Sequence, residues 1–221
     1  MNVQVILLAA GSGVRLKAGE PKAFVLLKDK PLFVHSLAVF QKIKMVKGIV
    51  VVGHKDHLER FKILCRGFNK VCAVVAGGAA RADSVKCALA VINKNLDIVL
   101  VHDAARPLID AGMVNRLLTA LKHYQAAIVA VPVKATIKKV NAKALTVEET
   151  PRRDQMWEAQ TPQGFHKDIL IKAHRRKLAG EATDDAMLAE RMGVKIKIVM
   201  GDYRNIKITT PEDLKIAKGL M

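Results

Sequence analysis

Apolar, β-branched runs alternate with longer amphipathic stretches through the first 130 residues of the chain. The runs have the length and composition of buried strands: Val3–Leu8, Gly48–Val52, Val71–Val75, Ile98–Val101 and Ala127–Val131. Helical spacing between them predicts four helices, near Leu32–Gln41, Asp56–Leu64, Ala80–Ile92 and Ala111–His123. This order predicts an α/β fold, with a mostly parallel sheet and helices on both of its faces. In such sheets ligands bind beyond the carboxyl ends of the strands, so candidate site residues should follow the runs directly.

The pattern changes between residues 134 and 156, where the chain becomes polar and charged. Weak alternation at Thr136–Val140 and Leu145–Val147 predicts a β-hairpin arm that projects from the domain. The chain then returns through Ala159–Phe165, and the pattern predicts a helix near Lys167–Lys177 and a strand near Val194–Met200.

The last predicted helix has a clear start. Thr210 can cap it, Pro211 suits its first position, and Asp213 can complete a capping-box-like pair.

A length of 221 residues suits a single domain, and 51% hydrophobic residues suffice for a sizeable core. No run of about 18 uncharged apolar residues occurs, so the sequence predicts no membrane span. The N-terminal segment lacks the basic start of a signal peptide and fits a first strand. We therefore expect a cytoplasmic protein.

The net charge is +17, from 37 Lys and Arg against 20 Asp and Glu. Such a field favours anionic partners, either nucleic acid or phosphorylated metabolites. Aromatic residues make up only 4% of the chain and do not interleave with basic ones, so a stacking platform for single strands is poorly supported.

The first candidate site segment, residues 8–15, leaves the first predicted strand directly and reads LAAGSGVR. Its small residues allow a ligand to approach the backbone, whose N–H groups can hold phosphate oxygens, and Arg15 and Lys22 add positive charge. The spacing matches neither the P-loop nor the dinucleotide fingerprint. The alternative is an ordinary glycine-containing turn.

A second segment, GGAARADSV at 77–85, ends the third run with two glycines and places Ser84 early in a helix. It can offer backbone groups and a hydroxyl to a base edge; the alternative is a tight turn with Asp83 near a helix start.

A third segment, HDAARP at 102–107, places Asp103 at the end of a strand, where a carboxylate can hold Mg²⁺ on a triphosphate. Arg106 follows three residues later and can hold a second phosphate. The alternative is that Asp103 caps a helix.

Together these segments resemble the 2-C-methyl-D-erythritol 4-phosphate cytidylyltransferase family of the non-mevalonate isoprenoid pathway. The resemblance runs through LLAAGSGVR with PK, GGAARADSV, VHDAARP, the Thr136 arm, AQTPQGF, ATDDA and NIKIT. It implies a Rossmann-like nucleotidyltransferase fold, Mg²⁺ dependence, and a homodimer in which the 134–156 arms interlock.

The resemblance also implies roles for individual residues. It implies a CTP site formed by Ala9, Ala10, Gly11, Gly13, Arg15, Lys22, Gly78 and Ser84. Asp103 would hold Mg²⁺, and Lys207 would join Arg15 and Lys22 in binding phosphate. The polyol phosphate would contact Asp103, Arg106 and Thr183, with Thr136, Arg153 and Thr161 reaching in from the partner subunit. Ala79 stands where the family often has an acidic residue.

Two rival functions remain open from the sequence. A related enzyme, ribitol 5-phosphate cytidylyltransferase, uses the same scaffold, but Ala104-Ala105 and Thr183-Asp184 look more like the methylerythritol enzyme. The second rival is a basic nucleic-acid-binding protein with a degenerate version of this fold. Intact Arg15, Lys22 and Asp103 argue against it, so we expect CTP and a polyol phosphate as partners, with no nucleic acid and no membrane.

Overall fold

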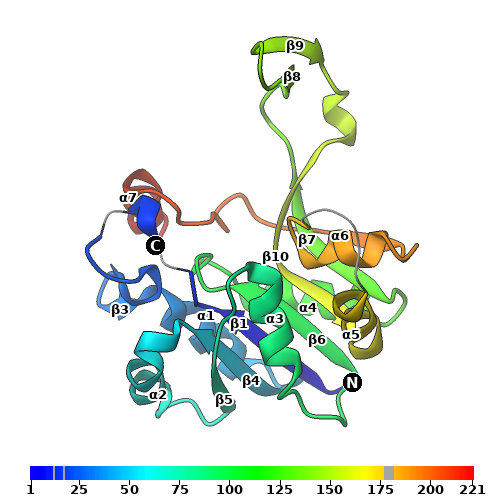
Figure 1. Ribbon diagram of the computed structural model, residues 1–221. Helices are drawn as coiled ribbons and strands as arrows, with labels where there is room; N and C mark the ends of the chain where they lie inside the picture. The colour runs from blue at the N-terminus through cyan, green and yellow to red at the C-terminus, as the bar shows by residue number, and fades with distance from the viewer. Residues whose placement is uncertain (12, 17, 177–181) are drawn as a thin grey trace.

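A seven-stranded sheet forms the centre of the computed structural model, which describes residues 1–11, 13–16, 18–176 and 182–221 (Figure 1). The strand order is β11-β7-β10-β6-β1-β4-β5. β1 is parallel to β4 and β6, whereas β10 runs antiparallel to both of its neighbours, β6 and β7. The strands are β1 (Val3–Leu8), β4 (Val46–Gly53), β5 (Val71–Ala76), β6 (Ile98–Asp103), β7 (Ala126–Pro132), β10 (Trp157–His166) and β11 (Ile196–Met200).

Helices cover both faces of the sheet, as the alternation of strands and helices predicts. Alternate side chains of β1 point to opposite faces: Val5 and Leu7 belong to one core cluster, and Ile6 belongs to the other. The first cluster packs against α1 (Leu32–Lys42), α2 (Leu58–Cys65) and α4 (Ala111–Ala120). The second packs against α3 (Arg81–Leu89), α5 (Lys167–Arg175) and α6 (Asp185–Glu190).

A small third cluster joins the end of the chain to its beginning. Ala217 of α7 (Pro211–Leu220) is buried with Leu27 and Ile208, next to the short hairpin β2 (Leu26–Leu27) and β3 (Lys30–Pro31). The capping box predicted for α7 is present, because the Thr210 hydroxyl accepts from the Asp213 N–H and the Asp213 carboxylate accepts from the Thr210 N–H. The Ile208 N–H donates to the Ala105 carbonyl at 2.8 Å, so this segment lies beside the carboxyl end of β6.

The predicted hairpin arm projects well beyond the domain (Figure 1). Its strands are β8 (Lys139–Asn141) and β9 (Thr146–Glu149), paired antiparallel and exposed throughout. They begin later than the expected Thr136–Val140 and Leu145–Val147 runs.

Other boundaries also differ from the sequence prediction. The return segment expected at Ala159–Phe165 is part of the long strand β10. The helix expected from Asp56 begins as a 3₁₀ turn at Lys55–His57, and α3 ends at Leu89 instead of Ile92. Lys177, the expected end of α5, and Ser12 of the first loop lie outside the described residues.

Within the described ranges, every helix is too short or too polar to cross a bilayer.

Candidate functional site

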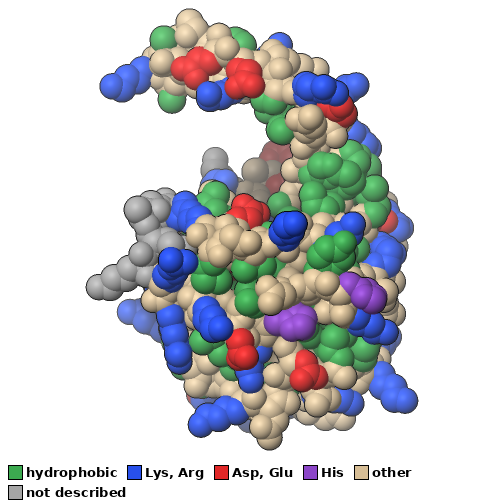
Figure 2. Space-filling model, turned by 90° about the vertical axis from the view of Figure 1, so that its right-hand side faces the viewer, with side chains coloured by type: hydrophobic (Ala, Val, Ile, Leu, Met, Phe, Trp, Pro, Cys, Tyr) green, Lys and Arg blue, Asp and Glu red, His purple; other side chains and the backbone are tan. Residues whose placement is uncertain are grey.

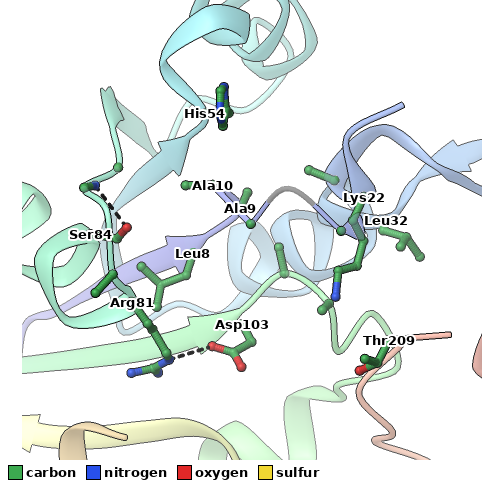
Figure 3. Close-up of a pocket in the computed structure, with 18 of the residues that line it drawn as sticks. Leu8, Ala9, Ala10, Lys22, Leu32, His54, Arg81, Ser84, Asp103 and Thr209 are labelled. Carbon is green, nitrogen blue, oxygen red and sulfur yellow. Dashed lines mark hydrogen bonds and ion pairs between the residues drawn. The ribbon is translucent and has the colours of Figure 1, made fainter. Parts of the chain in front are cut away.

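A cavity of about 790 Å³ opens at the carboxyl ends of β1, β4, β5 and β6 (Figure 3). The three segments singled out in the sequence line it together, joined by the segment before α7. The lining residues are Leu8–Gly11, Gly13, Arg15, Lys22, Ala23, Leu32, His54, Lys55, Gly77–Arg81, Ser84, Asp103–Ala105, Lys207 and Thr209. The predicted nucleotide-binding residues therefore share one cavity with Arg15, Lys22, Asp103 and Lys207.

The loop after β1 is held against the sheet at its start, where the Ala9 N–H donates to the Val52 carbonyl at 2.8 Å. Gly13 has φ +68°, and a Cβ on it would lie 2.5 Å from the Lys22 Cβ. Only glycine satisfies both demands without strain. This close approach places the Lys22 backbone against the loop, and Arg15 lines the same cavity.

Lys22 is tied to the segment that precedes α7. Its Nζ donates to the Ile208 carbonyl at 3.0 Å. Burial, and then the positive charges of Lys207 and Arg15, lower its pKa from the ordinary value. The positive charges of Lys22, Lys207 and Arg15 therefore repel one another, and a bound polyanion would offset this repulsion.

The second loop packs tightly against the first. A Cβ on Gly77 would lie 2.5 Å from the Ala10 Cβ and 2.8 Å from the Ser84 Oγ. The Gly78 N–H donates to the Ser84 Oγ at 3.2 Å, which orients the hydroxyl at the cavity wall (Figure 3). Backbone groups and one hydroxyl are therefore available to a planar base.

Asp103 is the acidic residue of the cavity. Its Oδ2 accepts from the Lys207 Nζ at 2.6 Å, and its Oδ1 accepts from the Arg81 Nε at 3.3 Å. Burial alone would raise the pKa of Asp103, but Arg81 and Lys207 outweigh it and hold the pKa well below its ordinary value. Asp103 ends β6, and among the described helices the next one, α4, is capped by Asp110, so the Asp103 carboxylate faces the cavity.

Arg81 lines the cavity but was not among the residues predicted from the sequence. It opens α3, and its guanidinium also donates to the Asp185 carboxylate at 2.7 Å. Burial would lower the pKa of Arg81, but Asp185 and then Asp103 outweigh it and hold the pKa above the ordinary value. The sequence feature that could have identified Arg81 is its position as a basic residue at the start of a predicted helix, just after a glycine-rich turn.

Two predicted substrate contacts have other roles in this structure. Arg106 lies outside the cavity lining, and its buried guanidinium donates to the Asn205 and Ala159 carbonyls at 2.7 and 3.2 Å. Thr161 accepts from the Asp103 N–H at 3.1 Å within one subunit. The prediction that Thr161 reaches in from a partner is therefore wrong, because β10 pairs with β6 and places Thr161 beside Asp103 of its own chain.

The remaining predicted contacts are exposed and lie outside the cavity. Thr136 and Arg153 belong to the arm, where an Arg153 guanidinium N–H donates to the Lys134 carbonyl at 3.3 Å. Thr183 precedes α6. Their contacts with substrate stay predictions.

Among the described residues, no group of three or more His, Cys, Asp or Glu side chains is arranged to hold a metal ion. Asp103 alone can still serve a Mg²⁺ whose other ligands are phosphate oxygens and water, which is how this ion is commonly bound.

The matches to known proteins extend over nearly the whole chain and include every residue that lines the cavity. The sequence profile of the 2-C-methyl-D-erythritol 4-phosphate cytidylyltransferase family matches residues 3–221. The enzyme of that name from Alkaliphilus metalliredigens is 43% identical over 225 residues, covering 100% of this chain and 93% of the relative. The one from Geobacillus kaustophilus is 44% identical over 225 residues, covering 100% and 97%.

Solved structures agree with the sequence relatives. The 4-diphosphocytidyl-2C-methyl-D-erythritol synthase of Anaerococcus prevotii superposes with a TM-score of 0.88 at 28% identity, covering 99% of this chain and 97% of that one. The 2-C-methyl-D-erythritol 4-phosphate cytidylyltransferase of Thermus thermophilus gives 0.79 at 32% identity, covering 100% and 98%. With the profile match over nearly its full length, the chain belongs to the 2-C-methyl-D-erythritol 4-phosphate cytidylyltransferase family.

Proposed function

We propose that this chain transfers CMP from CTP to 2-C-methyl-D-erythritol 4-phosphate, giving 4-diphosphocytidyl-2-C-methyl-D-erythritol and pyrophosphate. One observation carries the proposal: Arg15, Lys22 and Lys207 surround the same cavity as the carboxylate of Asp103, in a chain of this family. That arrangement suits a triphosphate better than it suits a neutral ligand.

The chemistry needs charge and position more than it needs a base. A phosphate oxygen of the polyol phosphate attacks the α-phosphorus of CTP, the bond to the bridging oxygen breaks, and pyrophosphate leaves with the electron pair. Because the nucleophile is already an anion, no side chain has to remove a proton. Arg15 and Lys22 stabilise the negative charge that grows on the α-phosphate and the leaving group.

Recognition of the nucleotide is assigned to the two small-residue loops. The backbone around Ala9, Ala10, Gly11 and Gly13 holds the phosphates, while Gly78 and Ser84 contact the base. Tight packing of Gly77 against Ala10 fixes one loop relative to the other.

Asp103 is the residue that would hold Mg²⁺. Its lowered pKa keeps it ionised, and it lies in the triphosphate cavity. The ion would neutralise phosphate charge and orient the chain of phosphates.

We also propose that the arm mediates a homodimer. Leu145 and Val147 are 81% and 59% exposed on it, and Figure 2 shows the arm standing clear above a hollow, with hydrophobic side chains gathered where it meets the domain. Burial against a second copy would remove this apolar surface from water. Thr136 and Arg153 of one arm would then reach the polyol phosphate in the partner's cavity.

A direct assay separates this function from its rivals. Pyrophosphate release is measured with CTP, Mg²⁺ and either 2-C-methyl-D-erythritol 4-phosphate or ribitol 5-phosphate. We expect kcat/KM to favour the methylerythritol substrate by at least tenfold. A higher kcat/KM with ribitol 5-phosphate would identify that compound as the substrate instead. No release with either, together with tight salt-dependent binding of nucleic acid, would favour the binding protein instead.

A further inference from the structure

Arg81 joins the cavity to a buried pair of side chains behind it. Its Nε donates to the Asp103 carboxylate at 3.3 Å, and its terminal nitrogen donates to the Asp185 carboxylate at 2.7 Å. One guanidinium thus bridges β6 and α6 from the start of α3. In Figure 3 the Arg81 guanidinium points toward the Asp103 carboxylate, and a dashed line marks the contact between them.

The pair behind Arg81 is almost wholly excluded from water. The side chains of His174 and Asp185 are 2% and 1% exposed, and the His174 Nε2 lies 2.8 Å from the Asp185 Oδ1. The His174 Nδ1 has no hydrogen-bond partner among the described residues. A buried pair of this kind adds little to the stability of the fold, so a functional role for His174 and Asp185 is to be sought in the groups that they contact.

The two cations on Asp103 differ in how firmly they are held. Within the described part of the chain, the Lys207 side chain has Asp103 as its only ion-pair partner and is 44% exposed. Arg81 is 29% exposed and is anchored by a second carboxylate. An arriving triphosphate can therefore draw Lys207 away while Arg81 keeps its place.

We propose that Arg81 is a positioning residue for Asp103 and that the buried His174–Asp185 pair fixes the Arg81 guanidinium. The inference rests on the proposed function, since it assigns Asp103 to the metal and phosphates. In this arrangement Arg81 keeps Asp103 oriented after Lys207 has moved to the phosphates. A planar guanidinium is required, because an ammonium cannot donate to both carboxylates in the same fixed geometry.

Two variants test the proposal, Arg81→Lys and Asp185→Asn. Arg81→Lys preserves the charge next to Asp103 but not the bridge, and Asp185→Asn removes the charged anchor while keeping its shape. We expect each to lower kcat by roughly 10- to 100-fold, since small misplacement of a catalytic group has effects of that size. The Mg²⁺ concentration for half-maximal rate should rise. The Kd of CTP measured by calorimetry without Mg²⁺ should stay within about twofold, because Ala9, Gly78 and Ser84 are untouched.

A double-mutant cycle checks that the two residues act in series. Once Arg81→Lys has broken the bridge, adding Asp185→Asn should lower kcat by less than about twofold more. If Asp185→Asn fails to fold, the partly exposed Arg81→Lys variant still decides the question through its kcat, its Mg²⁺ requirement and its CTP affinity.

The matched control is Gln4→Met, which alters a buried polar side chain at the amino end of β1. Gln4 bonds to Cys72 and to the Asn93 N–H, far along the strand from the cavity. It should lower the melting temperature without changing kcat or the Mg²⁺ requirement. Wild-type kcat and Mg²⁺ requirement in Arg81→Lys would overturn the proposal, as would additive effects in the cycle. Failure of the proposed function would differ, because wild-type protein itself would then release no pyrophosphate.

Discussion

His102 and Asp103 are neighbours in the chain with opposite environments. β6 alternates its side chains, so Asp103 faces the cavity while His102 is fully buried in the core. The His102 Nδ1 lies 2.9 Å from the Thr161 Oγ1, and its Nε2 lies 3.2 Å from the Arg106 carbonyl. This pattern assigns the neutral ring with its proton on Nε2, donating to the carbonyl.

Stability should depend on pH because of His102. Burial lowers the pKa of His102 to about 4, whereas the unfolded chain titrates near its ordinary value of about 6.5. Between these values the unfolded state binds a proton that the folded state does not, so stability falls as pH drops from about 6.5 to 4, by up to about 3 kcal/mol. Urea unfolding without metal at pH 7, 6 and 5 measures the slope. His102→Gln should flatten that slope, and an unchanged slope in the variant would contradict the assignment.

Most of the residues that line the cavity could be predicted from the sequence. The hydrogen bonds and ion pairs that hold their side chains in place could not. Ala9 and Asp103 could be predicted because they lie at the carboxyl ends of β1 and β6, and Gly13 because it belongs to the loop that follows β1. The role of Arg81 depends on contact with Asp185, 104 positions away, which no local pattern reveals. The sequence prediction was that Arg106 binds the substrate phosphate. In the structure its guanidinium donates to the carbonyls of Asn205 and of Ala159 in β10, and no local pattern shows that these residues pack against it.

Among the elements, the arm and β10 differ most in how well the sequence predicts them. The polar composition of 134–156 predicted a projecting hairpin, and the structure has one. The antiparallel insertion of β10 between β6 and β7 was missed, because periodicity gives no strand order. That insertion is what places Thr161 beside Asp103 in the same subunit.

The proposed role of the arm predicts the oligomeric state. Leu145→Glu combined with Val147→Glu should convert a homodimer into monomers, because charges replace the exposed apolar side chains that a partner would bury. Turnover should fall as well, since Thr136 and Arg153 would no longer reach the other cavity. Light scattering after gel filtration gives the mass. The control is Lys143→Glu, an exposed charge change in the same hairpin, which should stay dimeric; a dimer in the double variant would rule out this interface.

Across the whole molecule, the excess of positive charge should speed the arrival of CTP. The net charge is +17, and Figure 2 shows Lys and Arg side chains scattered over the viewed face instead of gathered in one stripe. A broad field of this kind raises the association rate of anions and is screened by salt. We expect kcat/KM for CTP to fall by about tenfold between 20 and 300 mM KCl at about constant kcat. A flat kcat/KM would mean that the surface charge does not steer the nucleotide.

The most direct test of cytidylyl transfer in this cavity is the kcat of Lys22→Ala with saturating CTP, Mg²⁺ and 2-C-methyl-D-erythritol 4-phosphate. Lys22 lies in the cavity with Arg15, Lys207 and Asp103, and its charge is assigned to the phosphates during transfer. We expect kcat to fall by about 10²–10³, which is typical of removing one such donor, and the melting temperature to stay close to that of the wild type. A variant with near wild-type kcat would contradict the assignment of this cavity to cytidylyl transfer.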